Sequence, residues 1–295
     1  MKKRTVIAST LTISTLTAGL SLMNQFAHNI LYRQRLDKSN EEDWYSDLGG
    51  KKFKIKNHKK LYLQGYLFEE ENAKRTIVCL HRLEQSSQTL KETIPYLKKL
   101  FPCSNVLLYD AHAHGLSDGY IRGFGYQDVL DLMYFNTYVL QKYGEDHHLI
   151  MYGQGVGANT ILNASGLGQL KNVDMIISEG AYDNVYHYLS ARCQKSLNIS
   201  HKINAPIIRQ FIKKEINKDI KKMNTVALVK KNEIPTIFVH SKEDGDVPFK
   251  HVFSVYNHNA SVKMLFPIKE KSLYELIDKT DTYTLSLQEF VNENI

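Results

Sequence analysis

Short apolar runs alternate with longer amphipathic stretches along most of the chain. The runs have the length and β-branched content of strands, at residues 52–56, 61–68, 76–80, 105–109, 149–152, 174–178, 236–240 and 262–266. Helical patterns separate most of them, at residues 88–100, 126–143, 156–164, 250–257 and 282–292. This alternation predicts an α/β fold with a mainly parallel sheet, to which the first two strands add an antiparallel edge.

The N-terminal residues 1–35 form a separate segment. Lys2, Lys3 and Arg4 are followed by no Asp, Glu, Lys or Arg until Arg33. Such a run can cross a hydrocarbon core, which needs about 20 residues, so we expect a single-pass signal anchor in the cell membrane with the domain extracytoplasmic. A cleavable signal peptide is one alternative, although no A-x-A site follows the run, and a buried amphipathic helix is another. Residues 36–50 would then link the anchor to a domain at 51–295.

The sequence GQGVG at residues 153–157 stands between an expected strand and an expected helix. A turn of the form G-x-S-x-G in this position is a nucleophile elbow, which holds a serine hydroxyl above the sheet. Here Gly155 occupies the central position. Glycine suits the strained backbone of such a turn, but it has no group that could attack a carbonyl. A glycine-rich turn can also mark nothing more than tight packing.

Three further motifs follow the order of one known fold. HRL at 81–83 stands where an H-G-x turn is usual, DAHAHGLSDG at 110–119 is similar to D-x-R-G-H-G-x-S, and IPTIFVHSKEDGDVP at 234–248 resembles the strand and loop that present a triad acid. Residues 51–295 therefore resemble the α/β-hydrolase superfamily, and within it the membrane-associated bacterial serine hydrolases related to the serine aminopeptidases (S33). The resemblance implies an eight-stranded, mostly parallel sheet flanked by helices, with a lid formed by the helical, basic insertion at about 184–232.

The same resemblance assigns positions in a site. Gly155 would stand at the nucleophile position, Asp244 at the acid position, and Leu83 and Val156 in the oxyanion-hole region. A Ser-His-Asp triad acts as a unit, because the histidine takes the serine proton while the acid fixes the imidazole. With only the acid retained, the expected protein is a degenerate hydrolase, a pseudoenzyme that serves as a scaffold or binds a small molecule or an acyl- or peptide-like ligand.

Two further departures concern the base and the oxyanion hole. The base would fall near Glu270 or Lys271, in a segment without histidine, and Arg82 replaces the glycine of the H-G-x turn. The arginine would place a cation beside the oxyanion hole. The alternative function is an active serine-type esterase or peptidase with an unrecognised nucleophile, for which Ser117 and Ser178 are candidates because both lie near strand ends.

No cofactor or metal is expected. His112 and His114 resemble the start of the metallo-hydrolase signature H-x-H-x-D-H, but Leu116 and Ser117 replace its Asp-His pair. The formal charge of +7 is modest for 295 residues, and without a recognition module it does not indicate nucleic-acid binding. The lysines within residues 51–60 could meet anionic lipid headgroups or acidic envelope polymers. Alternatively they keep an edge strand soluble.

Overall fold

The computed structural model describes residues 2–33, 43–276 and 282–295. All eight expected strands are present: β1 (Lys51–Lys56), β2 (Tyr62–Phe68), β3 (Arg75–Leu80), β4 (Ser104–Tyr109), β5 (His148–Gln154), β6 (Val173–Glu179), β7 (Thr236–Ser241) and β8 (Lys263–Ile268). They form one sheet in the order β1-β2-β4-β3-β5-β6-β7-β8. Strand β2 pairs antiparallel with β1 and β4, and the other neighbours pair in parallel. The expected α/β class and the antiparallel edge are confirmed.

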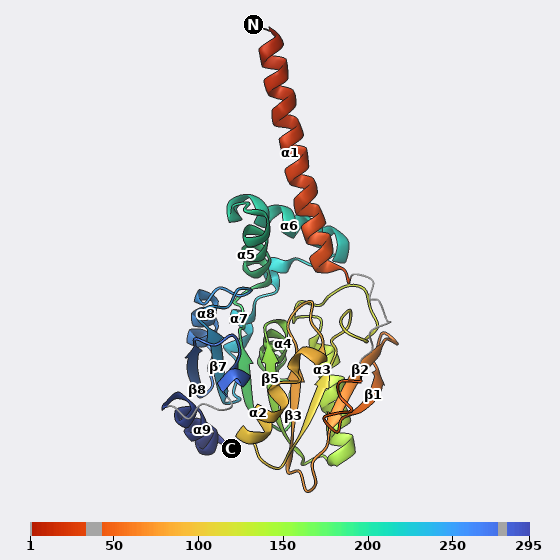
Figure 1. The fold of residues 1–295 in the computed structure, drawn as a ribbon, viewed down its shortest axis with the longest axis vertical. Coiled ribbons are helices and arrows are strands. Elements are labelled where there is room, and N and C mark those ends of the chain that lie inside the picture. Colours follow the sequence, from red (N-terminus) through yellow and green to blue (C-terminus); the bar gives the residue numbers. More distant parts are fainter. Residues whose placement is uncertain (1, 34–42, 277–281) are drawn as a thin grey trace.

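Helices cover both faces of this sheet (Figure 1). They are α2 (Thr93–Leu100), α3 (Val129–Tyr143), α4 (Val156–Gly166), α8 (Lys250–His258) and α9 (Thr282–Asn294). Helices α2 and α9 share one apolar cluster with the sheet, and α3, α4 and α8 share another. Strand β5 shows why two clusters form, since Ile150 and Tyr152 enter the first while Leu149 and Met151 enter the second. Successive residues of a strand point to opposite faces, so a central strand needs apolar residues throughout.

The insertion between β6 and β7 is helical, as expected. It contains α5 (Val185–Leu197), α6 (His201–Ile216) and α7 (Thr225–Val229), with a short 3-10 turn, η3 (Ile220–Lys222). Helices α5 and α6 lie at the end of the molecule from which α1 (Lys2–Leu31) projects (Figure 1). Tyr188 and Ile208 from these two helices enter a third apolar cluster, which also contains Phe124 and Val156. The lid is therefore packed onto the turn that precedes α4.

The C-terminal part of α1 is packed against the lid. Met23, Ala27, Ile30 and Leu31 are buried in the third apolar cluster, and their spacing of i, i+4, i+7 and i+8 places them on one helix face. The Arg122 guanidinium donates to the backbone carbonyls of the last turn of α1 at 2.8 and 2.9 Å. The end of α1 and the lid thus form one packed unit.

The membrane anchor expected from the sequence would lie in the part of α1 that precedes these buried residues. Among the helices in the described part of the chain, none is long and apolar enough to cross a membrane. The division of the chain at residues 35 and 50 stays a prediction, and residues 34–42 of the expected linker lie outside the described residues.

Candidate functional site

The turn between β5 and α4 has the backbone of a nucleophile elbow. Gly155 has φ 53° and ψ −114°, which a side-chain-bearing residue adopts only at a cost of about 1–3 kcal/mol. Its N–H donates to the Glu179 carbonyl at 2.8 Å. A Cβ at Gly157 would lie 2.5 Å from the Leu80 carbonyl oxygen, so α4 can approach β3 only with glycine there. The GQGVG sequence is explained by this close strand-to-helix turn.

The Arg82 side chain lies directly over Gly155. A Cβ placed at Gly155 would be 3.3 Å from Arg82 Cγ. Beyond this contact the guanidinium forms two ion pairs, from Nη1 to Asp244 Oδ2 at 2.9 Å and from Nη2 to Glu179 Oε1 at 3.5 Å. The arginine side chain is 14% exposed and the two carboxylates are 4% and 1% exposed. The group expected at the acid position is therefore paired with a buried cation.

These pairings decide the charge of the site. Burial alone would raise the pKa of Asp244, but the attraction of the Arg82 guanidinium outweighs it and holds that pKa below its ordinary value. Burial likewise disfavours the charged form of Arg82, yet the attraction of Asp244 and Glu179 raises its pKa above the ordinary arginine value. Both partners stay ionised near neutral pH, and the negative charge of Asp244 is not available to orient an imidazole.

Glu179 is the centre of a second set of hydrogen bonds. Its Oε2 accepts from the Tyr152 hydroxyl at 2.6 Å and from the Leu273 N–H at 3.3 Å. The Gln154 amide donates to the Tyr152 hydroxyl at 2.7 Å and to Ser272 Oγ at 3.0 Å. Because Ser272 and Leu273 follow β8, these bonds fix the segment where a catalytic histidine was expected. Sequence reasoning missed Glu179, although a carboxylate ending the buried strand beside the elbow was a usable signal.

A pocket of about 420 Å³ opens beside this network. The residues that line it are Arg82, Gln85, Thr89, Gln154, Glu243, Asp244, Gly245, Asp246, Lys271, Ser272 and Tyr274. The segment expected to carry the base thus reaches the pocket through Lys271. The carboxyl ends of β3, β5, β6 and β7 meet at this edge of the sheet, which is where open α/β sheets bind ligands.

The comparisons with known proteins agree with this geometry. No family model matches the chain. It is similar to the uncharacterized protein YqkD of Bacillus subtilis (strain 168), 23% identical over 233 residues, which are 78% of this chain and 75% of YqkD. Its structure is similar to that of the Pyrococcus furiosus esterase Pf2001, with a TM-score of 0.66, 17% identity, and 90% of this chain and 98% of that chain covered. The chain has the α/β-hydrolase fold.

Other solved structures with the α/β-hydrolase fold are also similar. An acetyl xylan esterase from Paenibacillus sp. R4 matches with a TM-score of 0.60 and 11% identity, over 93% of this chain and 99% of that chain. Est1E from Butyrivibrio proteoclasticus, bound to ferulic acid, matches with a TM-score of 0.58 and 14% identity, over 82% of this chain and 98% of that chain. At such low identities the likeness concerns the fold.

Neither of the two serines considered above, Ser117 and Ser178, is exposed at the candidate site. Ser117 Oγ donates to the Asp110 carbonyl at 2.5 Å and accepts from the Gln64 N–H at 2.8 Å. Ser178 lies within β6, paired in register with Gly153 on the neighbouring strand. Each serine is only 1% exposed. Neither hydroxyl is open to a substrate in this conformation.

The expected oxyanion-hole region lies under the lid. Leu83 and Val156 are both buried in the third apolar cluster, between the elbow and helices α1, α5 and α6. That their amides form an oxyanion hole stays a prediction.

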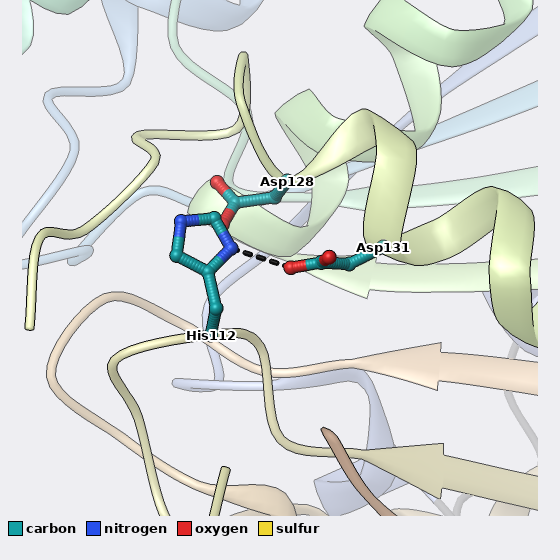
Figure 2. Close-up of side chains that lie close together, drawn as sticks. All are labelled: His112, Asp128 and Asp131. Carbon is teal, nitrogen blue, oxygen red and sulfur yellow. Dashed lines mark hydrogen bonds and ion pairs between the residues drawn. The ribbon is translucent and has the colours of Figure 1, made fainter. Parts of the chain in front are cut away.

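The two histidines of the H-x-H pattern take different partners. His112 Nδ1 is hydrogen-bonded to Asp131 and lies 3.4 Å from Asp128 Oδ1 (Figure 2). His114 Nδ1 instead contacts the His112 carbonyl at 3.0 Å, and its ring lies 5.0 Å from that of His81. The pattern therefore does not bring two imidazoles onto one metal ion.

His112, Asp128 and Asp131 do place three donor atoms within 4.8 Å of one another, so they are a group of the described residues that could hold a metal ion. A protonated, positively charged His112 also satisfies the contacts with Asp128 and Asp131, without a metal ion. Burial lowers the pKa of His112, but the attraction of Asp128, together with the hydrogen bond and charge of Asp131, outweighs it and raises that pKa above the ordinary value. Asn57 Nδ2 also donates to Asp131 at 2.9 Å. We interpret the group as a buried ion pair that joins the loop after β4 to the start of α3.

Proposed function

We propose that this chain is a catalytically inactive protein of the α/β-hydrolase fold, located at the cell surface, that binds a ligand in the pocket beside Arg82. One observation carries the proposal: the Arg82 side chain covers Gly155, and its guanidinium is ion-paired with Asp244. In a serine hydrolase a carboxylate orients the histidine that activates the serine. Here the carboxylate holds an arginine, and the elbow presents no nucleophile.

The ion pairs also oppose opening of the site. A substrate carbonyl could approach the elbow only if the arginine side chain moved away. That movement would leave Asp244 and Glu179 buried and unpaired, and breaking a buried ion pair in this way costs about 3–5 kcal/mol. The closed arrangement is therefore the stable one.

The charges of the pocket suit a peptide-like ligand. Its walls carry charges of both signs, from Arg82 and Lys271 on one hand and Glu243 and Asp246 on the other. A short peptide offers amides and terminal charges that match these groups. The described lining thus supports the peptide-like member of the expected ligand classes.

An active esterase is the second candidate, because the structures of the Pyrococcus and Paenibacillus esterases share this fold. The test is turnover of short acyl nitrophenyl esters and aminoacyl anilides, with labelling by a serine-reactive fluorophosphonate. The Pf2001 esterase serves as the positive control and heat-inactivated protein as the background. We expect neither turnover nor labelling above background. Activity that co-purifies with the chain and disappears on Ser117→Ala or Ser178→Ala would establish the esterase instead.

A further inference from the structure

One part of the lid, residues 185–222, which we call the basic lid, carries a large net positive charge. It contains nine Lys and Arg against two Asp and Glu, a formal charge of +7. The whole chain has 38 Lys and Arg against 31 Asp and Glu, which is also +7. The remaining residues therefore carry 29 of each and are neutral overall. They include a second lysine cluster, at residues 51–60, whose charge is balanced by acidic residues elsewhere in the chain. The unbalanced charge of the basic lid suits an acidic partner.

Helix α6 turns its basic side to solvent. Its buried residues, Asn204, Ala205, Ile208 and Ile212, lie along one face. The exposed positions on its other side are Lys202, Ile203, Pro206, Gln210, Lys213 and Lys214. Ile203 is 55% exposed. Three more exposed lysines follow the helix, at Lys218, Lys221 and Lys222. The outer surface of the basic lid thus combines six lysines with an apolar side chain.

The two acidic groups of the basic lid have other partners. Glu215 accepts a hydrogen bond of 2.5 Å from the Tyr32 hydroxyl at the end of α1. Asp219 accepts from Arg209 Nε at 2.8 Å. Within the described residues, none of the six exposed lysines forms an ion pair with a carboxylate. Lys221 lies over the Tyr186 ring, 5.5 Å from its centroid, and the charges of the other five lysines are open to an acidic partner.

Helix α1 packs against the basic lid. It leaves the molecule at the lid (Figure 1), held there by its four buried residues and by the bond from Tyr32 to Glu215. Before that junction Leu20 and Leu22 are 40% and 50% exposed. No Asp, Glu, Lys or Arg occurs from residue 5 to residue 32. A helix that carries no Asp, Glu, Lys or Arg from residue 5 onward, and that has exposed leucines, therefore meets the basic lid.

We propose that the outer face of the basic lid docks onto an anionic lipid bilayer. Lysines bind acidic headgroups, and apolar side chains beside them enter the boundary between headgroups and acyl chains. Leu20, Leu22 and Ile203 supply those apolar groups. A nucleic acid or an acidic protein would match the lysines but would leave the leucines of α1 in water. The docking requires no membrane-spanning helix, and it is independent of whether the pocket binds a ligand.

The test compares vesicles of phosphatidylcholine alone with vesicles that also contain phosphatidylglycerol, using the purified full chain and co-sedimentation. Each lysine near an anionic surface contributes about fivefold to binding. The triple variant Lys213→Glu, Lys214→Glu, Lys218→Glu should therefore bind the anionic vesicles more weakly by on the order of 100-fold. High salt should remove the preference for phosphatidylglycerol, because it screens exposed charges.

The matched control has the same change of charge on the first strand. Lys52→Glu, Lys54→Glu, Lys56→Glu alters three exposed lysines of β1, and it should leave vesicle binding nearly unchanged. A second lid variant with glutamine at the same three positions removes the charges without reversing them and is less prone to unfold. Its binding to the anionic vesicles should also weaken, by a smaller factor. Equal losses for the lid and β1 variants, no preference for phosphatidylglycerol, or equally tight binding to polyglutamate or duplex DNA would overturn the proposal.

Discussion

Replacing Arg82 by methionine tests the buried ion-pair network most directly. Methionine keeps the apolar stem that lies over Gly155 and removes the guanidinium. Asp244 and Glu179 would then stay buried at 4% and 1% exposure without their cation. Removing one partner of a buried pair costs about 3–5 kcal/mol. Since the arginine side chain is 14% exposed, water can reach part of the network, and we expect a loss near the lower end of this range.

The loss should depend on pH in a defined direction. In the wild type the folded-state pKa of Asp244 is lowered, so its contribution to stability is present above the unfolded pKa of about 3.9 and is lost as the pH falls through the folded pKa. In the variant the attraction of the guanidinium is gone, so that burial, the largest influence, raises the pKa against the two hydrogen bonds from the Asp246 and Val247 N–H groups that remain. The orphaned carboxylate then takes up a proton on folding, and the free-energy gap to the wild type narrows from about pH 7 towards about pH 4.

Urea unfolding measures this gap, followed by the fluorescence of Trp44, which is the single tryptophan of the chain and packs on Tyr66 with ring centroids 4.9 Å apart. The control is Lys98→Met, which removes one partner of a partly exposed pair with Glu70 at 3.0 Å and should cost less than about 1 kcal/mol.

A rescue completes the design, because adding Asp244→Asn and Glu179→Gln to Arg82→Met removes the orphaned charges and should recover most of the loss. A loss below about 1 kcal/mol, or one that is equal at neutral and acidic pH, would refute the reasoning.

Two further substitutions test the elbow and the buried histidine. Gly155→Ser should destabilise the fold by about 1–3 kcal/mol and stay unlabelled by fluorophosphonate. The control Gly168→Ser, at φ 66° with open space around it, should destabilise the fold less. Strong labelling of Gly155→Ser would show that a base already lies beside the elbow. The raised pKa of His112 means that its contribution is complete below the unfolded pKa of about 6.5 and is lost as the pH rises through the folded pKa. The unfolding free-energy difference between wild type and His112→Gln should therefore shrink on the alkaline side, and a constant difference would contradict the ion-pair assignment.

The sheet could be predicted from the sequence because each central strand repeats the same local pattern. β3 and β5 contain continuous apolar runs, at residues 77–80 and 149–152, as strands buried on both faces must, and the helices between the strands give the crossover connections of a parallel sheet. Strand ends were less accurate. β5 runs to Gln154, two residues beyond the expected end, because pairing with β6 continues to the elbow itself.

The packing of α1 could not be read in the same way. The apolar residues of α1 are compatible with lipid, with a signal peptide or with a protein core, and the sequence alone does not choose among them. The burial of Met23, Ala27, Ile30 and Leu31 depends on α5 and α6, which lie more than 150 residues further along the chain. The anchor in the membrane stays a prediction, and the packing shows only where the helix meets the domain.

At the candidate site, too, the sequence shows the individual residues but not the contact between them. Gly155 in the elbow and Arg82 in the turn after β3 are visible in the sequence as departures from the hydrolase motifs, but nothing in the sequence links the two. The structure joins them in one contact, because the space that a serine side chain would need at Gly155 is bounded by Arg82 Cγ. The glycine leaves room for the arginine, and the arginine reaches Asp244, the residue expected at the acid position. Restoring the serine alone would crowd the arginine stem, and removing the arginine alone would strand two buried carboxylates. The two departures therefore support each other, and the return to a hydrolase site requires several changes made together.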